Sequence, residues 1–451
     1  MGIVRYMRAT PTMNSAVCIL GGKFSSILFI LPMFYNLLSC MILAETTVVT
    51  SSKSQTFTRP VLKHRIESID ILRGLIMLIM AIDHVRDYFH PAIAANDPTN
   101  MVTTTPFLFF TRFITHYCAP LFVFLSGVSA QLAGGRRTKK QLSIFLIKRG
   151  LWLVIVELVL ISFAFSLDPL HRVLPLQVIW AIGVSMILLG ISIWLPIRVI
   201  AATGILLFFG HDICDYLVLP QTGTGGFFWK LFLTGHREFF HMAGPFFVKT
   251  NYAVLPWAGV MMLGYVFGLV YKSSFDPARR ERILIASGMF LLALFIILRV
   301  FNIYGDPSPW SVQPTPVLSV LSLLNVSKYP PSLLYLSITL GPGLIVLASL
   351  ENVKNKLTDI FIIYGNVPFL YYILHWFILR TFSVAEFYLQ GYGTKDIYNS
   401  KLMFFFRPDG MGISLGWVYA VWFVVITILY FPCRAFARYK RTHSQWWLSY
   451  L

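Results

Sequence analysis

Ionisable residues gather at both ends of one apolar segment, RIESIDILRGLIMLIMAIDHVRDYFH, which spans residues 65–90. The middle of this segment is apolar enough to lie in a membrane. Charged groups near hydrocarbon are costly unless they are paired or face a water-filled cavity, so a helix that keeps this many of them is expected to use some for function. These residues are Asp70 and Arg73 at one end, and Asp83, His84, Arg86, Asp87 and His90 at the other.

Helical spacing brings part of this set onto one face. Arg73 and His84 are eleven residues apart, or about three turns, so they share a face and lie about 16 Å apart along the axis. The spacing i,i+3 allows Asp70 to pair with Arg73, and Asp83 with Arg86. The helix therefore offers a cation near one membrane surface and an imidazole toward the other.

A second segment, FFTRFITHYCAPLFVFLSGVSA, repeats the combination, because Arg112 and His116 share a face at i,i+4. Imidazole can act as a general base or a nucleophile near neutral pH, and arginine can bind phosphate or stabilise an oxyanion. Two such helices facing one cavity would form an acyl-transfer centre. The structural alternatives are a helix-end ion pair for Arg73 and a tie between helices for Arg112 and His116.

Further candidates occur toward the C-terminus. Lys328 and Tyr329 precede an apolar helix in NVSKYPPSLLYLSITLGPG, and Asn366 and His375 lie in the aromatic segment YGNVPFLYYILHWFILR. The chain contains neither a Walker sequence nor a Rossmann glycine fingerprint, so ATP-driven transport and nicotinamide chemistry lack support. Its five cysteines have no CxxC spacing, and no metal site is predicted.

The elements that must position these residues are membrane helices. The chain of 451 residues is 57% hydrophobic and 12% charged, which leaves too few polar residues to cover a soluble domain of this length. A net charge of +18 could suggest nucleic-acid binding. The basic residues sit in short loops, however, as in membrane proteins with many spans, so no nucleic-acid partner is predicted.

Apolar runs of about twenty residues recur along the chain without strand-like alternation, and each can cross the bilayer as a helix. The predicted fold is an all-α, polytopic membrane bundle with about ten core helices and one possible N-terminal helix. Residues 1–64 form an N-terminal segment, and residues 65–451 form the membrane domain. The predicted core spans are Ile69–Phe89, Pro106–Ala133, Leu142–Leu167, Val173–Pro196, Ile197–Phe209, Ala253–Tyr271, Ile283–Ile303, Ser332–Leu350, Ile360–Leu379 and Ile413–Phe436.

Basic loops alternate with less basic ones along these spans. GGRRTKK, YKSSFDPARRER, ENVKNK and the tail RAFARYKR all fall on one side, which is therefore predicted to be cytoplasmic. The leading apolar run Phe24–Ala44 resembles a signal peptide. Cleavage would invert every later loop against its charge, so an uncleaved helix is preferred over a cleaved signal or a misassigned start codon. The predicted location is the bacterial cytoplasmic membrane.

The motifs together resemble a known family. The two segments above, with NYAVLPWAGVMMLGYVFG, NVSKYPPSLLYLSITLGP and GNVPFLYYILHW, are similar in type and order to bacterial relatives of the heparan-alpha-glucosaminide N-acetyltransferase catalytic domain. The resemblance runs from about Arg65 to the C-terminus. It implies transfer of acetyl from cytoplasmic acetyl-CoA to a sugar amine or hydroxyl across the membrane, with a histidine at the centre. His84 suits the pattern of the wider membrane acyltransferase superfamily, and His90, in DYFH, suits that of the lysosomal enzymes.

The main hypothesis is thus a membrane acetyltransferase whose catalytic residue is His84 or, second, His90, with Asp83 beside it. Acetyl-CoA, a glycan acceptor and membrane lipids are the expected partners, and the sequence leaves room for a homo-oligomer. The rival is a transporter or flippase of a glycan or lipid that uses the same charges without covalent chemistry. A third reading is a non-catalytic scaffold. The predicted substrate-binding residues are Arg73, Asp70, Arg86, Arg112, His116, Lys328, Tyr329, Asn366 and His375.

Overall fold

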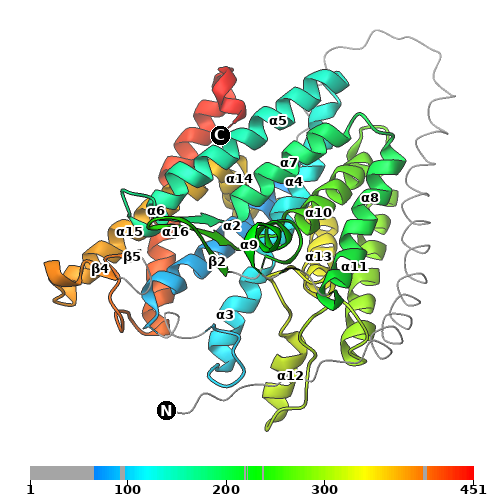
Figure 1. Cartoon of the computed structure of the whole chain (residues 1–451). Coiled ribbons are helices and arrows are strands. Elements are labelled where there is room, and N and C mark those ends of the chain that lie inside the picture. The colour runs from blue at the N-terminus through cyan, green and yellow to red at the C-terminus, as the bar shows by residue number, and fades with distance from the viewer. Residues whose placement is uncertain are drawn as a thin grey trace, which may run out of the picture.

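The apolar runs of the sequence form helices, which pack into the bundle shown in Figure 1. The computed structural model describes residues 66–91, 97–217, 220, 222–235, 238–399 and 404–450, so the predicted helix Phe24–Ala44 lies outside the described residues. The main helices are α2 (Glu67–Phe89), α3 (Pro106–His116), α4 (Cys118–Gly134), α5 (Lys139–Val156), α6 (Ser162–Ser166), α7 (Val178–Ser192), α8 (Ile197–Gly210), α9 (Gly223–Trp229), α10 (Val254–Phe267), α11 (Pro277–Val300), α12 (Pro316–Leu324), α13 (Leu333–Ser349), α14 (Lys356–Asn366), α15 (Pro368–Leu389) and α16 (Leu415–Thr442).

Several of these helices are long and apolar enough to cross a membrane, which makes the protein a multi-pass membrane protein. Within the described residues there are five such segments, and six if the bent pair α14–α15 counts as one. The larger number of about ten spans stays a prediction. The five are Pro106–Gly134, Ile197–Tyr216, Val254–Tyr271, Pro277–Val300 and Leu415–Thr442.

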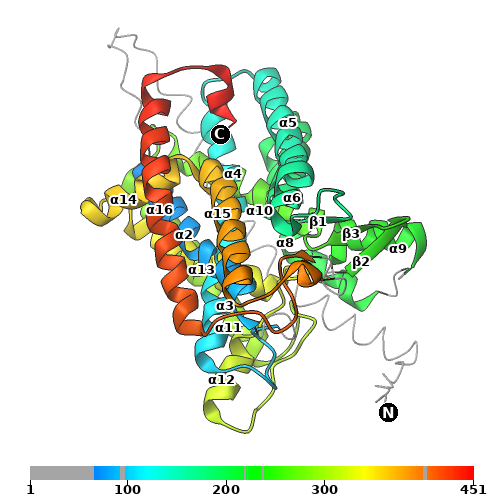
Figure 2. The same ribbon diagram turned by 90° about the vertical axis from the view of Figure 1, so that its left-hand side faces the viewer.

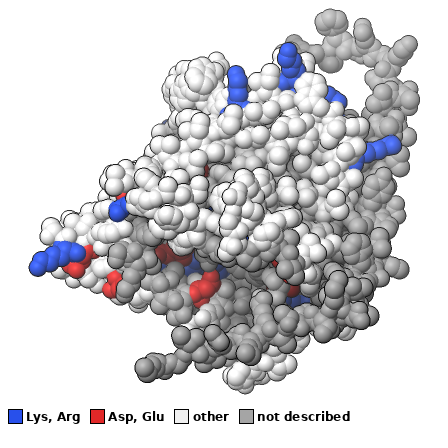
Figure 3. All heavy atoms as spheres, in the orientation of Figure 1, with Lys and Arg blue, Asp and Glu red and all other residues white. Residues whose placement is uncertain are grey.

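Charged side chains are visible on the face of the molecule drawn in Figure 3. On the face drawn in Figure 3, several Lys and Arg side chains project from the end of the molecule at which α16 finishes. The Asp and Glu side chains visible on this face lie farther toward the middle and the opposite half.

The predicted span Ile360–Leu379 is not one straight helix. Helices α14 and α15 meet at Val367 with a bend of 84°. Pro368 explains the break, because proline lacks the N–H that a continuous helix needs and disfavours helical backbone in the residue before it. The bend leaves Asn366 at the end of α14, beside one of the cavities described below.

The all-α prediction also missed a small sheet. The predicted span Val173–Pro196 begins with strand β1 (Val173–Leu176), which pairs in parallel with β3 (Phe246–Thr250), and β3 pairs antiparallel with β2 (Glu238–Ala243). Figure 2 shows this sheet and α9 projecting from one side of the bundle. A two-stranded sheet of β4 (Tyr398–Asn399) and β5 (Phe404–Phe405) follows α15. Residues on these strands and in the loops next to them line the candidate site described below.

Helix α2 lies at the centre and packs closely against α14. A Cβ added to Gly74 would lie 1.9 Å from the carbonyl oxygen of Phe361, and one added to Gly365 would lie 1.9 Å from that of Asp70. Only glycine therefore fits at either position. The close contact fixes α2, and with it the charged residues of the site, against the C-terminal half of the chain.

Candidate active site

A buried ion network centres on Asp83, near the end of α2. Its two carboxylate oxygens accept hydrogen bonds from Arg112 Nη1 at 2.7 and 2.6 Å, and its Oδ1 accepts one from Thr115 Oγ1 at 2.9 Å. Arg86 Nη2 also donates to Asp83. Because Asp83, Arg86 and Arg112 are all buried, their pairing neutralises charges that would otherwise be costly there. The predicted Asp83–Arg86 pair is confirmed.

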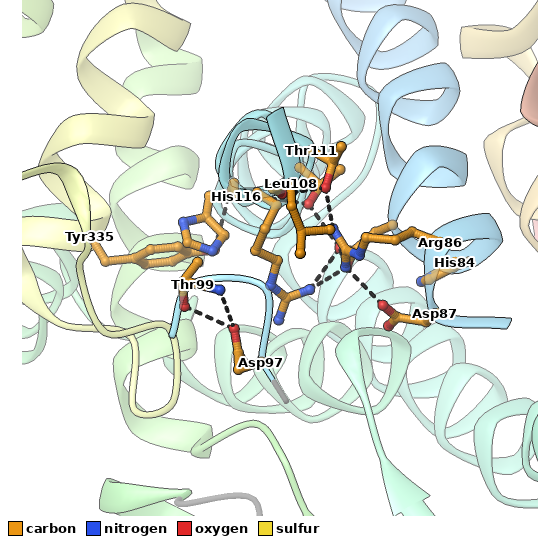
Figure 4. A network of polar contacts seen from close by, with 12 residues as sticks. His84, Arg86, Asp87, Asp97, Thr99, Leu108, Thr111, His116 and Tyr335 are labelled. Atoms are coloured by element: carbon orange, nitrogen blue, oxygen red, sulfur yellow. Dashed lines mark hydrogen bonds and ion pairs between the residues drawn. The ribbon is translucent and has the colours of Figure 1, made fainter. Parts of the chain in front are cut away.

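The network joins α2 to α3, as Figure 4 shows. Arg86 Nη2 donates to Asp87 Oδ1 at 2.8 Å, and Arg86 Nη1 donates to Thr111 Oγ1 at 3.3 Å. Arg86 thus has protein partners on both helices. His116, one turn beyond Arg112, is buried and points the other way, with its ring 5.3 Å from that of Tyr335. The shared face predicted for Arg112 and His116 does not bring both to one cavity in the described part of the chain.

His84 lies beside the network but has different partners. Its Nδ1 is 2.7 Å from Nε2 of His375, and the two rings stack with their centroids 4.9 Å apart. Trp376 stacks on His84 at 4.3 Å. Among the described residues, no hydrogen-bond partner reaches the other ring nitrogen of His84, Nε2. One nitrogen of this imidazole is therefore held by protein, and the other is available for a substrate.

His84 lines a cavity of about 230 Å³, called here the outer cavity, at the α3 end of α2. Five residues predicted from the sequence line it: Asp83, His84, Arg112, Lys328 and Tyr329. Asp87 also lines it; sequence reasoning named Asp87 among the charges of this helix but did not assign it to the site. Sequence reasoning missed the further polar lining residues Gln177, Lys249, Asn251 and Arg407.

Small sheets position these missed residues. Strand β3 carries Lys249 and leads to Asn251, and Arg407 follows β5. Burial lowers the pKa of Arg407 from its ordinary value. The only sequence signal for Arg407 is a single basic residue in the aromatic loop FFFRPDG, which is too weak to single it out.

A second cavity of about 290 Å³, the inner cavity, lies toward the other end of α2. The predicted residues Arg73 and Asn366 line it. Arg73 Nη1 donates to Asp70 Oδ1 at 3.1 Å, which confirms that predicted pair, and Arg73 Nη2 donates to Ser129 Oγ at 2.8 Å. The buried Oδ1 of Asn366 has no hydrogen-bond partner among the described residues. Further basic and aromatic lining residues are Arg149, Lys440, Phe145 and Phe369.

The two cavities adjoin. Met80, Phe122 and Val178 line both of them. His84 lies on the outer side of this shared boundary, and Tyr372, whose ring is 6.5 Å from that of His84, lines the inner cavity. A thin substrate arm that enters the inner cavity could therefore bring its end to the imidazole of His84, where a second substrate in the outer cavity could meet it.

His90, the second predicted catalytic residue, lies elsewhere. It follows the last residue of α2 and lines neither cavity. Burial, assisted by the positive charge of Arg86, lowers the pKa of His90 from its ordinary value. The imidazole is therefore biased toward its neutral form.

Comparison with known protein families assigns the chain to one of them. The heparan-alpha-glucosaminide N-acetyltransferase catalytic domain matches residues 65–299, which include α2, α3 and the ion network. No curated protein matches the chain. The matched residues make up more than half of the 451, so the chain belongs to the heparan-alpha-glucosaminide N-acetyltransferase catalytic family and is an acetyl-CoA-dependent membrane acetyltransferase.

Proposed function

We propose that the protein transfers acetyl from acetyl-CoA on the cytoplasmic side of a bacterial inner membrane to a sugar amine or hydroxyl on the other side. The single observation that supports this most is the junction of two cavities beside His84, one lined by basic residues of α2, α5 and α16, and the other open to the loops at the opposite end. The family supplies the reaction class, and the cavities suggest its direction.

The inner cavity suits the donor. Its volume of about 290 Å³ can hold the narrow pantetheine arm of CoA but not the whole molecule. The nucleotide would therefore stay near the basic residues Arg149 and Lys440 and the loop GGRRTKK, where cations attract its phosphates. Asn366 would donate to or accept from the amide groups of the arm.

The outer cavity suits the acceptor. An acceptor amine there attacks the thioester carbonyl, so a C–N bond forms and the C–S bond breaks. His84 Nε2 accepts the proton that the amine loses and returns it to the departing sulfur, which leaves as the thiol of CoA. His375 orients the imidazole through the Nδ1 contact. Lys328 and Arg112 lie in the same cavity and favour negative charge on the carbonyl oxygen.

The proposed direction of transfer, from the cytoplasm to the other side, also implies how the chain lies in the membrane. About ten membrane crossings would place the basic loops in the cytoplasm and the sheet with α9 on the other side. Exposed apolar side chains on α16, such as Trp417, Phe423 and Phe431, would contact lipid or a second copy of the chain.

A sided assay tests the proposal. Purified protein is reconstituted into vesicles in one orientation, and protease accessibility of the C-terminal tail determines which orientation this is. Radiolabelled acetyl-CoA is then supplied on one side of the vesicle membrane and glucosamine on the other. We expect labelled N-acetylglucosamine only when acetyl-CoA is on the side of the C-terminal tail. Movement of glucosamine without acetylation would instead support a transporter.

Arg149→Gln is expected to raise the KM for acetyl-CoA about tenfold, the loss expected for one hydrogen bond to a charged group. The KM for the acceptor should not change, because Arg149 lines only the inner cavity. Steady-state kinetics with each substrate varied in turn measures both values. Arg282→Gln is the control, since Arg282 belongs to the basic segment YKSSFDPARRER, on the side predicted to be cytoplasmic, but lines neither cavity. Equal effects of the two variants would contradict the assignment.

A further inference from the structure

A third cavity, called here the lateral cavity, is larger than the two described above, with a volume of about 580 Å³. Its walls come from the 3-10 turn after α8 (His211–Tyr216), from α9 and the π-helical turn after it (Lys230–Thr234), and from the end of α11 with the loop that follows. It shares no lining residue with the inner or outer cavity. It is therefore a separate site.

Two polar side chains in this wall lack protein partners. The carboxylate of Asp215 lines the lateral cavity and has no hydrogen bond or ion pair with the described residues. Thr234 lines it too, is only 7% exposed, and its hydroxyl likewise has no partner in the described part of the chain. Thr234 is buried, and a buried hydroxyl is normally satisfied, so it indicates a ligand that forms hydrogen bonds. Asp215 is half-buried, and its carboxylate adds an acceptor on the wall of the same cavity.

Other polar residues of the wall are already fixed by the protein. Asp306 Oδ2 accepts hydrogen bonds from Ser327 N at 2.8 Å and from Ser332 Oγ at 2.7 Å. Arg299 donates to backbone carbonyls, including that of Ser308 at 2.7 Å. Burial raises the pKa of Asp306. These bonds hold the wall rigid, so the cavity is preformed.

Aromatic rings complete the lining. Trp229, Tyr216 and Tyr304 border the cavity, and the rings of Tyr216 and Tyr304 stack with their centroids 6.5 Å apart. Aromatic faces beside a carboxylate and a hydroxyl suit a saccharide, whose C–H faces pack on rings while its hydroxyls form hydrogen bonds. A lipid tail would leave the carboxylate of Asp215 unpaired in hydrocarbon. The described residues also include no group of three or more His, Cys, Asp or Glu placed to hold a metal ion.

We propose that the lateral cavity is a second, non-catalytic binding site for a saccharide. The two cavities are linked in the sequence, because Thr234 of the lateral cavity precedes β2 and β3, and Lys249 on β3 lines the outer cavity. The acceptor would then be an oligosaccharide that is bound at more than one place rather than a single sugar. The choice of an amino sugar as the ligand rests on the proposed function.

Calorimetry without acetyl-CoA tests the site in the full-length protein. The probes are glucosamine and a tetramer of β-1,4-linked glucosamine. We expect the wild-type protein to bind the tetramer at least about tenfold more tightly than the monomer. This difference in affinity should be smaller in each of three variants, Asp215→Asn, Trp229→Ala and Thr234→Val. Asp396→Asn, which removes an exposed carboxylate from the loop after α15, is the control and should leave it intact.

Kinetics provides the second readout. The three variants should raise the KM for the tetramer about tenfold and leave kcat and the KM for glucosamine unchanged. The proposal would be overturned if the wild-type protein bound tetramer and monomer with equal affinity. It would also be overturned if the three lateral-cavity variants kept the wild-type preference for the tetramer, as the Asp396→Asn control should. If wild type binds the tetramer preferentially but acetylates neither probe, the proposed function fails and the second site stands.

Discussion

His84→Ala is expected to lower kcat for acetyl transfer by a factor of about 10² to 10⁴, the usual contribution of a general base. The KM for acetyl-CoA should change little, because His84 does not line the inner cavity. The loss follows from removal of the imidazole whose Nε2 is open to a substrate in the outer cavity. Transfer of radiolabelled acetyl to glucosamine by purified protein measures the rate.

His90→Ala is the matched comparison, since both histidines lie near the end of α2 and only His84 lines a cavity. It should retain most of the wild-type kcat. His84→Gln guards against a folding defect, because glutamine keeps a polar side chain of similar length while it cannot accept a proton. If His90→Ala instead lost most of its kcat while His84→Gln kept near-normal activity, His90 rather than His84 would be the general base.

Asp83→Asn is expected to destabilise the protein by about 3–5 kcal/mol, because it removes the negative partner of a buried ion cluster and leaves positive charge uncompensated. Arg112, whose Nη1 donates to both oxygens of Asp83, loses its ion-pair partner. Thermal unfolding in detergent, followed by tryptophan fluorescence, should show a marked fall in Tm.

Asp87→Asn is the control for this effect. The side chain of Asp87 is 39% exposed, so its pairing with Arg86 is screened by solvent and its loss should cost at most about 1 kcal/mol. The double change Asp83→Asn with Arg112→Gln should recover part of the stability lost in Asp83→Asn alone, because it removes the unpaired cation as well. Equal losses in Asp83→Asn and Asp87→Asn would show that the cluster does not behave as a buried pair.

Local patterns in the sequence predicted the helices and the short-range ion pairs well. The pairs Asp70–Arg73 and Asp83–Arg86 follow from i,i+3 spacing alone. The break at Val367 was missed, although Pro368 signals it, because the apolar run continues across the proline. Strand β1 was absorbed into a predicted span because four apolar residues ahead of an apolar helix carry no distinguishing period.

The long-range part of the site could not be predicted. His84 and His375 are 291 residues apart, and no periodicity connects them. The sequence marked each as a candidate only because it is an ionisable residue in an apolar helix. Arg407 and Asn251 reach the outer cavity from loops after short strands, whose pairing depends on tertiary contacts rather than on local preference.

The boundary shared by the two cavities consists of Met80, Phe122 and Val178, all of them apolar. An ion or a hydrated proton would lose its hydration shell beside these side chains, so this apolar boundary opposes the passage of ions between the cavities. With the proposed direction of transfer, a cell would acetylate molecules outside its cytoplasm from cytoplasmic acetyl-CoA without spending its proton-motive force, and cleavage of the thioester would drive the reaction.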